Sequence, residues 1–316
     1  MSADTAKGSR ALAWACLFAI YVVWGTTYLA IRVVVREMPP FAAAALRFSS
    51  AGLVLGGLAL VFERKQGWPS VRQWRDYSLA GICFLAGGNA GVMWAEQRVP
   101  SGLAALLVAT VPLWVTFLDG LRPGGQPWTR RVWMGVLLGF IGVAFVARPQ
   151  GGAEAGHWAG IAALQAASLL WTFGALYVQS VRRKLATLSA TAVEMIVGSV
   201  VLFLESRLAG EDLTRVAHAS PDAWRGLAYL VVFGSLIGFT AFAYALHELP
   251  ASTVGTYAYV NPVVAVLLGR MFLAEPLAAS TLAGAVLIVV AVVVTTHRSA
   301  AAAGRLSTAD KACDGP

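Results

Sequence analysis

The chain has 316 residues, of which 58% are hydrophobic and 13% are charged, and its mean hydropathy is +0.68. Because about a quarter of the residues in a soluble domain are charged, this composition excludes an ordinary soluble protein and is typical of one that crosses a membrane many times. The net charge of +8 is assigned to basic loops at the membrane surface. The lipid bilayer is therefore an expected partner, and nucleic acid is not.

A transmembrane helix needs about 20 mostly apolar residues, and ten such stretches are predicted. In chain order they are residues 11–31, 41–62, 77–96, 101–121, 132–148, 157–178, 187–205, 224–246, 251–272 and 277–297. The first lacks a convincing cleavage site and is interpreted as a retained helix. Residues 1–10 and 298–316 are predicted to be cytoplasmic tails, with disorder over 1–9 and 298–316.

The distribution of basic residues predicts how the helices enter the membrane. With the amino terminus in the cytoplasm, 15 of the 24 Lys and Arg residues fall on the cytoplasmic side, and 8 fall on the other side. The remaining one, Arg47, lies within a helix. Since cytoplasmic loops carry the excess of positive charge, both termini are expected in the cytoplasm and the protein in the inner or plasma membrane.

The ten stretches form two similar halves. Residues that match at offsets of 147 to 150 are Trp24 with Trp171, Arg47 with Glu194, Gly88 with Gly238, Pro112 with Pro262, and Gly135 with Gly284. Five helices in each half force the two copies to cross the membrane in opposite directions. The sequence thus predicts an all-α membrane protein with two inverted five-helix repeats, residues 11–149 and 157–297, around a central cavity.

Two charged side chains lie inside predicted helices, where a charge costs on the order of 2.5–3.5 kcal/mol on insertion scales. These are Arg47 and Glu194, which occupy equivalent positions in the two halves. Both are predicted to line the cavity, and Glu194 is the candidate ion-coupling residue. Two alternatives stay open, a structural ion pair between them or an Arg47 side chain that reaches the outer interface.

Prolines and polar side chains mark the other candidate positions. Pro112 and Pro262 are predicted helix hinges, because proline removes a backbone hydrogen bond and bends a helix. Tyr257 and Asn261 share one face of the ninth helix, where they either line the cavity or bond a neighbouring helix. The other aromatic or hydrogen-bonding cavity candidates are Trp24, Thr27, Tyr28, Asn89, Trp94, Thr110, Trp114, Gln165 and Trp171. Such side chains suit amphipathic organic substrates.

Small residues recur on the fifth helix, where Gly135 and Gly139 are four residues apart. Faces of this kind allow close helix packing. Ordinary packing within the chain is one interpretation, and a homodimer through helices 5 and 10 is the other.

Several phrases of the sequence resemble a known family. They are YVVWGTTYLAIR at 21–32, ALRF at 45–48, VPSG at 99–102 and YAYVNP at 257–262. They are similar to the EamA family of the drug/metabolite transporter superfamily, over about residues 11–297. The resemblance implies ten helices in two EamA repeats, and a cavity walled by helices 1–4 and 6–9. It also implies peripheral helices 5 and 10, with metabolite export as the commonest activity.

The predicted function is secondary-active export of a small metabolite or drug-like compound, such as an amino acid or related amphipathic molecule, by alternating access. Import or antiport in the same fold is an alternative. An intramembrane enzyme is disfavoured, because no catalytic or phosphate-binding motif is present. No metal or cofactor is expected. With one Arg and one Glu deep in the helices, a zwitterion or lipophilic cation fits better than a phosphate.

Overall fold

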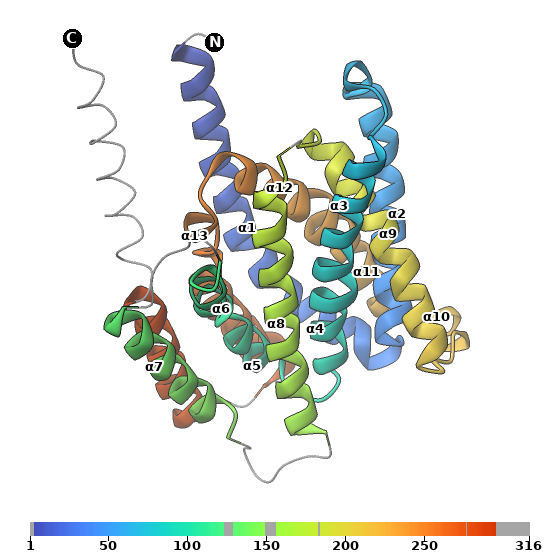
Figure 1. Ribbon diagram of the computed structural model, residues 1–316. Helices are drawn as coiled ribbons and strands as arrows, with labels where there is room; N and C mark the ends of the chain where they lie inside the picture. The colour runs from blue at the N-terminus through green and yellow to red at the C-terminus, as the bar shows by residue number, and fades with distance from the viewer. Residues whose placement is uncertain (1–2, 123–128, 149–155, 183, 276, 295–316) are drawn as a thin grey trace, which may run out of the picture.

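The computed structural model describes residues 3–122, 129–148, 156–182, 184–275 and 277–294, and within these ranges every regular element is a helix. The first half contains α1 (Ala3–Glu37), α2 (Pro40–Phe62), η1 (Arg64–Gln66), α3 (Val71–Gly81), η2 (Ile82–Asn89), α4 (Ala90–Ala95), α5 (Ser101–Val108), α6 (Val111–Asp119) and α7 (Arg130–Val146) (Figure 1). The second half contains α8 (His157–Ser180), α9 (Thr187–Leu208), α10 (Thr214–Ala217), α11 (Pro221–Tyr229), η3 (Leu230–Ile237), α12 (Gly238–Glu248), α13 (Ala251–Val254), α14 (Tyr257–Leu273) and a last helix, Ala279–Val294.

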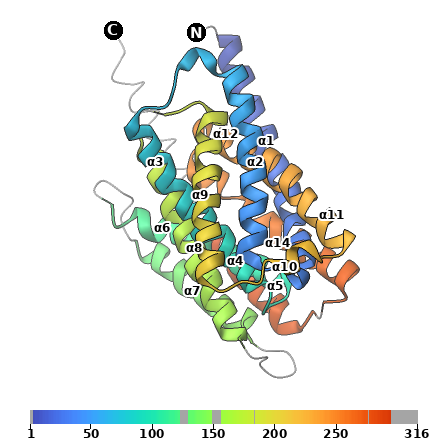
Figure 2. The same cartoon turned by 90° about the vertical axis from the view of Figure 1, so that its right-hand side faces the viewer.

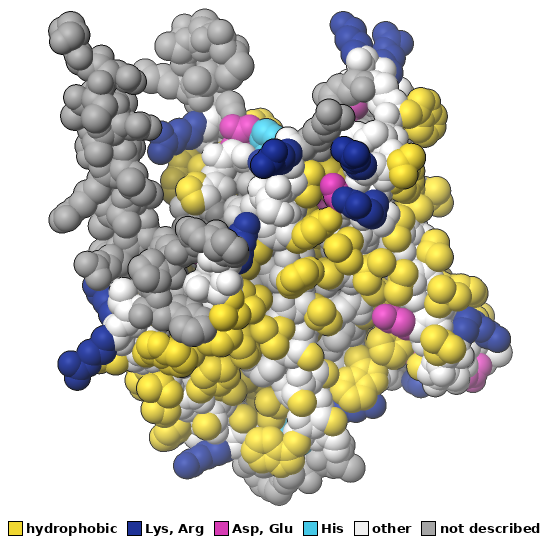
Figure 3. Space-filling model, in the orientation of Figure 1, with side chains coloured by type: hydrophobic (Ala, Val, Ile, Leu, Met, Phe, Trp, Pro, Cys, Tyr) yellow, Lys and Arg dark blue, Asp and Glu magenta, His cyan; other side chains and the backbone are white. Residues whose placement is uncertain are grey.

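Seven of the helices in the described ranges are long and apolar enough to cross a membrane. They are Arg10–Glu37, Pro40–Phe62, Val71–Ala95, Ser101–Asp119, His157–Ser180, Thr187–Leu208 and Pro221–Glu248. Tyr257–Leu273 and Ala279–Val294 are apolar but shorter. Figure 3 shows hydrophobic side chains over the middle of one face, with Lys and Arg mostly toward its two ends. The prediction of an all-helical membrane protein is confirmed, and the count of ten crossings remains a prediction.

Two helix starts differ from the predictions. Helix α1 begins at Ala3, so the disorder expected over residues 1–9 is wrong for residues 3–9. The third long helix begins at Val71 rather than at 77. Its polar first turn closes with a capping box, in which Ser70 Oγ accepts from the Gln73 amide and the Gln73 side chain accepts from the Ser70 amide. This turn is hydrophilic and therefore escapes a count of apolar residues. The tail predicted at 298–316 lies outside the described residues.

The helices in the third and eighth predicted stretches each contain an eight-residue π-helical segment, η2 (Ile82–Asn89) and η3 (Leu230–Ile237). Their starting residues are 148 apart, which is close to the offset of the sequence repeat. A π-helical turn is wider than an α-helical turn and occurs frequently at functional sites. The two segments are therefore places to look for a site shared by both halves.

Helices α2 and α9 lie side by side near the middle of the molecule (Figure 2). Small residues permit the close approach, since a Cβ atom added at Gly52 of α2 would lie 3.0 Å from Met195 Cβ of α9. Helix α3 approaches α9 even more closely, because a Cβ atom at Gly81 would collide with the backbone carbonyl of Glu194. Helix α9 is thus packed tightly on two sides.

Each helix of the α2/α9 pair caps the amino terminus of the other. Glu63 follows α2, and its carboxylate accepts from the amides of Leu188 (3.0 Å) and Ser189 (2.8 Å) and from the Ser189 hydroxyl (2.6 Å). Glu211 follows α9 and accepts from the amides of residues 41–42 at 3.0 and 2.8 Å. Negative charge stabilises the unpaired amides at a helix amino terminus. The two reciprocal caps require α2 and α9 to be antiparallel.

Helix α7 and the last helix, Ala279–Val294, pack on each other at one edge of the bundle (Figure 1). A Cβ atom at Gly142 would lie 2.9 Å from the Gly284 carbonyl oxygen, and one at Gly139 would collide with Leu113 of α6. The small face of α7 is therefore occupied within the chain, while Leu137 and Ile141 are exposed. The homodimer remains a prediction, and its contact surface would have to be this exposed apolar face.

The two proline-containing helices break at different places. In the fourth long helix, α5 ends at Val108 and α6 begins at Val111, so the break lies directly before Pro112. In the ninth predicted stretch, the turn between α13 and α14 precedes Tyr257, and Pro262 lies inside α14. The halves therefore share the prolines but not the position of the break. Hinge motion at these prolines stays a prediction.

Candidate functional site

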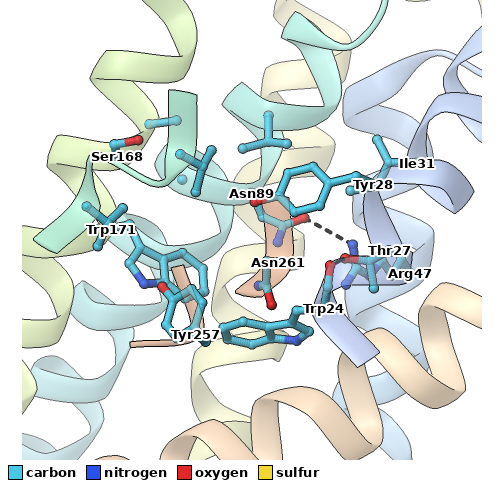
Figure 4. Close-up of a pocket in the computed structure, with 15 residues that line it drawn as sticks. Trp24, Thr27, Tyr28, Ile31, Arg47, Asn89, Ser168, Trp171, Tyr257 and Asn261 are labelled. Atoms are coloured by element: carbon cyan, nitrogen blue, oxygen red, sulfur yellow. Dashed lines mark hydrogen bonds between the residues drawn. The ribbon is translucent and has the colours of Figure 1, made fainter. Parts of the chain in front are cut away.

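A central cavity lies among α1, α2, η2, α8 and α14, where the two halves meet (Figure 4). The predicted cavity residues that line it are Trp24, Thr27, Tyr28, Arg47, Asn89, Trp171, Tyr257 and Asn261. Its other lining residues are Ile31, Gly88, Val92, Val108, Val111, Ala167 and Ser168. The lining is thus mostly apolar and aromatic, with a few polar groups that converge, as in a small-molecule site.

Arg47 is the one charged side chain in the lining of this cavity, all of which lies in the described ranges. Only 1% of its surface is exposed. Its Nε donates to Ser235 Oγ (2.8 Å), its Nη1 donates to Asn89 Oδ1 (3.1 Å), and its guanidinium carbon lies 4.6 Å from the centre of the Phe48 ring. The side chain therefore points into the bundle and does not reach the outer interface.

The two π-helical segments supply the groups that hold this part of the cavity. Asn89 is the last residue of η2, and Ser235 lies in η3, so both segments bond Arg47. The Gly234 carbonyl of η3 also accepts from Trp24 Nε1 at 3.2 Å. Ser235 was missed in the sequence analysis. A detectable signal was its position as a lone hydroxyl in the apolar run Leu230–Ile237.

On the side of the central cavity that faces away from Arg47, six rings form what we call the aromatic layer. Its members are Trp24, Phe84, Trp171, Phe239, Phe242 and Tyr257. Trp24 and Trp171, the pair matched by the sequence repeat, meet edge to face with their centres 5.5 Å apart. Tyr257 meets Trp24 in the same way at 5.2 Å. Edge-to-face contacts of this kind are favourable and fill space densely.

Glu194 lines a second cavity. Phe84 and Phe242 of the aromatic layer line this second cavity, whereas Trp24 and Trp171 of the same layer line the central one. The layer therefore stands between the two cavities. Arg47 and Glu194 lie on opposite sides of it, so the ion pair considered above is not formed in this structure.

Three other predicted residues form a separate cluster at the break of the fourth long helix. Gln165 Oε1 accepts from Thr110 Oγ1 and from Trp114 Nε1, both at 3.2 Å, and Gln165 Nε2 donates to the Leu107 carbonyl (3.3 Å). These bonds tie α5 and α6 to α8 and satisfy polar groups at the break. None of the three lines the central cavity. Trp94 also lies outside it and stacks on the Arg98 guanidinium at 3.5 Å.

Asn261 both lines the cavity and bonds a neighbouring helix. With its amide nitrogen directed at two carbonyl groups, it donates to Tyr257 O (3.2 Å) and to Tyr21 O of α1 (3.1 Å). The Tyr21 hydroxyl also bonds Thr256 Oγ1 at 2.6 Å. These bonds fix α14 against α1, so the two interpretations of Asn261 are compatible.

The chemistry of the central cavity is that of binding. Its polar groups are one guanidinium, two side-chain amides and several hydroxyls, and no nucleophile lies beside a base. Among the residues that the structure describes, no group of three or more His, Cys, Asp or Glu side chains is placed to hold a metal ion.

Comparison with known proteins extends this picture. A sequence model of the EamA-like transporter family matches the chain twice, over residues 10–148 and 158–297. The inner membrane transporter YedA of Escherichia coli (strain K12) is 38% identical over 263 residues, which are 83% of either chain. A transporter of Archaeoglobus fulgidus is 26% identical over 87% of this chain and 95% of its own. A crystal structure at 21% identity covers 90% of this chain and 96% of its own with a TM-score of 0.64, which shows a shared fold.

Proposed function

Because this chain belongs to the EamA-like transporter family, we propose that it is a secondary carrier that exports a small amphipathic metabolite by alternating access. The observation that carries the proposal is the buried Arg47 in an aromatic cavity between two π-helical segments. An ionisable side chain inside a membrane bundle is retained at a cost and marks a substrate or ion pathway.

The proposed architecture is ten crossings in two inverted repeats. Besides the seven long helices, the crossings are α7, α14 with α13, and Ala279–Val294. Helix α7 has 17 residues and is about 25 Å long, so it nearly spans a hydrocarbon core of about 30 Å. Two features support the inverted relation, which are the reciprocal caps on α2 and α9 and the pair of π-helical segments.

The aromatic layer is the proposed closure on the cytoplasmic side. The second cavity includes Lys184 and His247, at the ends of α8 and α12 that the basic loops assign to the cytoplasm. In this conformation the layer keeps that cavity apart from the central one. Opening would separate Phe84 of η2 from Phe242 of α12, whose ring centres are now 5.9 Å apart. Pro112 and Pro262 are the proposed bends for that movement.

Glu194 is the proposed ion-coupling residue, because it is a buried carboxylate on the cytoplasmic side of the layer. A carboxylate there can take up a proton from one side of the membrane. The test compares Glu194→Gln with the unchanged protein in transport assays over a range of external pH. We expect the substitution to remove the dependence on pH. An unchanged dependence would rule out Glu194 as the coupling group.

The carrier proposal is tested by reconstitution in proteoliposomes. Counterflow and flux driven by an imposed proton gradient are measured for aromatic acids, amino acids and cationic dyes. We expect a saturable flux that Arg47→Gln abolishes and that Arg270→Gln, an equal change at an exposed site, leaves intact. Flux that is driven inward would favour the importer alternative. If no compound shows counterflow, the carrier proposal fails.

Labelling of the native cysteines tests the location and orientation of the protein in the membrane. We propose that the protein lies in the inner or plasma membrane with both termini in the cytoplasm. Cys313 then reacts with a membrane-impermeant maleimide only after the cells are opened, whereas Cys83 is buried within the bundle. Labelling of Cys313 in intact cells would reverse the orientation.

A further inference from the structure

Within the part of the chain that the structure describes, Arg47 forms no ion pair with a carboxylate. Its three contacts, with Ser235, Asn89 and the Phe48 ring, are all with neutral groups. The two hydrogen bonds are made by Nε and Nη1. The guanidinium stays protonated at any physiological pH, and neutral hydrogen bonds orient it without balancing its charge.

The buried carboxylates of Glu194, Glu96 and Glu275 lie outside the lining of the central cavity. Glu194 lies beyond the aromatic layer, in the second cavity. Glu96 is near Arg32, whose guanidinium donates to its backbone carbonyl. Glu275 caps α5 by accepting from the amides of Ser101 (2.9 Å) and the next residue (3.1 Å). None of them lines the central cavity.

An uncompensated charge in a low-dielectric interior costs several kcal/mol even after relaxation. A ligand that brings a carboxylate beside the guanidinium removes this cost and gains charge-assisted hydrogen bonds, because guanidinium and carboxylate fit each other in a planar fork. A cation would add a second positive charge to the same cavity. A phosphate with two negative charges would meet only one positive group.

The position of the aromatic layer also argues against a zwitterionic substrate. The sequence predicts one Arg and one Glu in the cavity, which could hold the two charges of an amino acid. In the structure Trp24 and Trp171 stand between Arg47 and Glu194. A substrate in the central cavity therefore meets one charged group and aromatic walls.

We propose that the central cavity selects a monoanion, with its carboxylate on Arg47 and an aromatic or similarly apolar body against Trp24, Trp171 and Tyr257. This inference rests on the proposed carrier function and names the substrate class of the same site. Figure 4 shows Arg47, bonded to Asn89, on one side of the cavity, with the rings of Trp171 and Tyr257 on the other side and the Trp24 ring between them. The charged end and the apolar end of the substrate are thereby assigned to opposite walls.

The test measures binding of four matched probes to the purified full chain in detergent. They are 3-phenylpropionate, its neutral amide, 3-phenylpropylamine and phenylalanine. We expect 3-phenylpropionate to bind at least about tenfold more tightly than the amide and the amine, since at least one charge-assisted hydrogen bond distinguishes them. Phenylalanine should bind more weakly than 3-phenylpropionate, because nothing in the cavity balances its ammonium group.

Variants test whether Arg47 causes the preference for the acid over the amide. Arg47→Gln should reduce the acid-to-amide ratio to about one, Arg47→Lys should keep part of it, and Arg270→Gln should keep all of it. If Arg47→Gln does not fold, the selectivity of the unchanged protein and of Arg47→Lys still decides. Tighter binding of the amine or of phenylalanine overturns the proposal. The proposal also fails if no probe binds saturably, or if the preference for the acid survives in Arg47→Gln.

Counterflow of the same probes in proteoliposomes separates this proposal from the carrier function. Transport of the amine but not of the acid would refute anion selection and leave the carrier function intact. Binding of the acid with the expected selectivity, but transport of no compound, would support anion selection and refute the carrier function.

Discussion

The reciprocal caps on α2 and α9 give a stability prediction. Replacing Glu63 or Glu211 by Gln keeps the size of the side chain and removes its charge. Glu63→Gln weakens three hydrogen bonds at the start of α9, and Glu211→Gln weakens two at the start of α2. Each substitution also removes a negative charge from a helix amino terminus.

The expected magnitude follows from these bonds. Both carboxylates are partly exposed, so water replaces part of what is lost. A lost amino-terminal cap costs about 0.5–2 kcal/mol, and Glu63 should lie toward the upper end because it holds one more bond. The caps are at opposite ends of a helix pair about 30 Å long. The double variant should therefore lose about the sum, within roughly 0.5 kcal/mol.

Thermal unfolding of the purified protein in detergent measures these losses. A loss of 1 kcal/mol corresponds to a decrease in Tm of about 2–4 °C in a chain of 150–250 residues, and somewhat less in this longer one. Asp222→Asn is the control, because it also removes one negative charge, and the exposed Asp222 carboxylate pairs at 2.9 Å with Arg225 of its own helix, α11. Single variants as stable as this control, or a double variant no less stable than one single, would refute the reciprocal capping.

Three further predictions concern packing, the cavity and the aromatic layer. Gly81→Ala should lower the free energy of unfolding by about 1–3 kcal/mol through overpacking. Gly57→Ala is the control, because an added Cβ atom meets nothing within 4 Å there, and it should change the free energy of unfolding by less than about 0.5 kcal/mol. Similar thermal shifts for both variants would contradict the close approach of α3 to α9. Ser235→Ala removes the 2.8 Å bond to the guanidinium and should weaken acid binding about tenfold, while Ser50→Ala, whose hydroxyl bonds its own helix, should not. Trp171→Ala should open the aromatic layer and allow passive leak of substrate from proteoliposomes, and Trp171→Phe should not; equal leak through both would show that the closure lies elsewhere.

The sequence predicts the helices well because long apolar runs in a membrane protein have one structural solution. A helix lies in each of the ten predicted ranges, and its ends differ from the predicted ones by up to eight residues, the largest difference being at the start of α1. The π-helical segments could not be predicted, since nothing in the apolar runs 82–89 and 230–237 distinguishes a π-helical turn from an α-helical one. Their widening is a matter of packing across the bundle.

For the candidate site too, the sequence predicts which residues are equivalent but not how they are arranged in space. Repeat spacing identified Arg47 and Glu194 as equivalent, and each lies seven residues after the first residue of its helix, Pro40 or Thr187. That is about 10 Å from each start at about 1.5 Å per residue. Since α2 and α9 are antiparallel, equivalent positions fall toward opposite ends of the pair. The separation of the two charges is a property of the assembled pair and not of either stretch alone.

The reciprocal caps also bear on how the protein is made. The acceptor for the start of α2 is Glu211, 170 residues further along the chain. At a synthesis rate of about 5–20 residues per second, the ribosome needs roughly 10–30 s to reach it. During that interval the leading amides of α2 have only water or lipid headgroups as partners, and the first half waits as an unfinished subunit. A newly inserted first half is therefore the stage at which membrane quality control has most time to act on this protein.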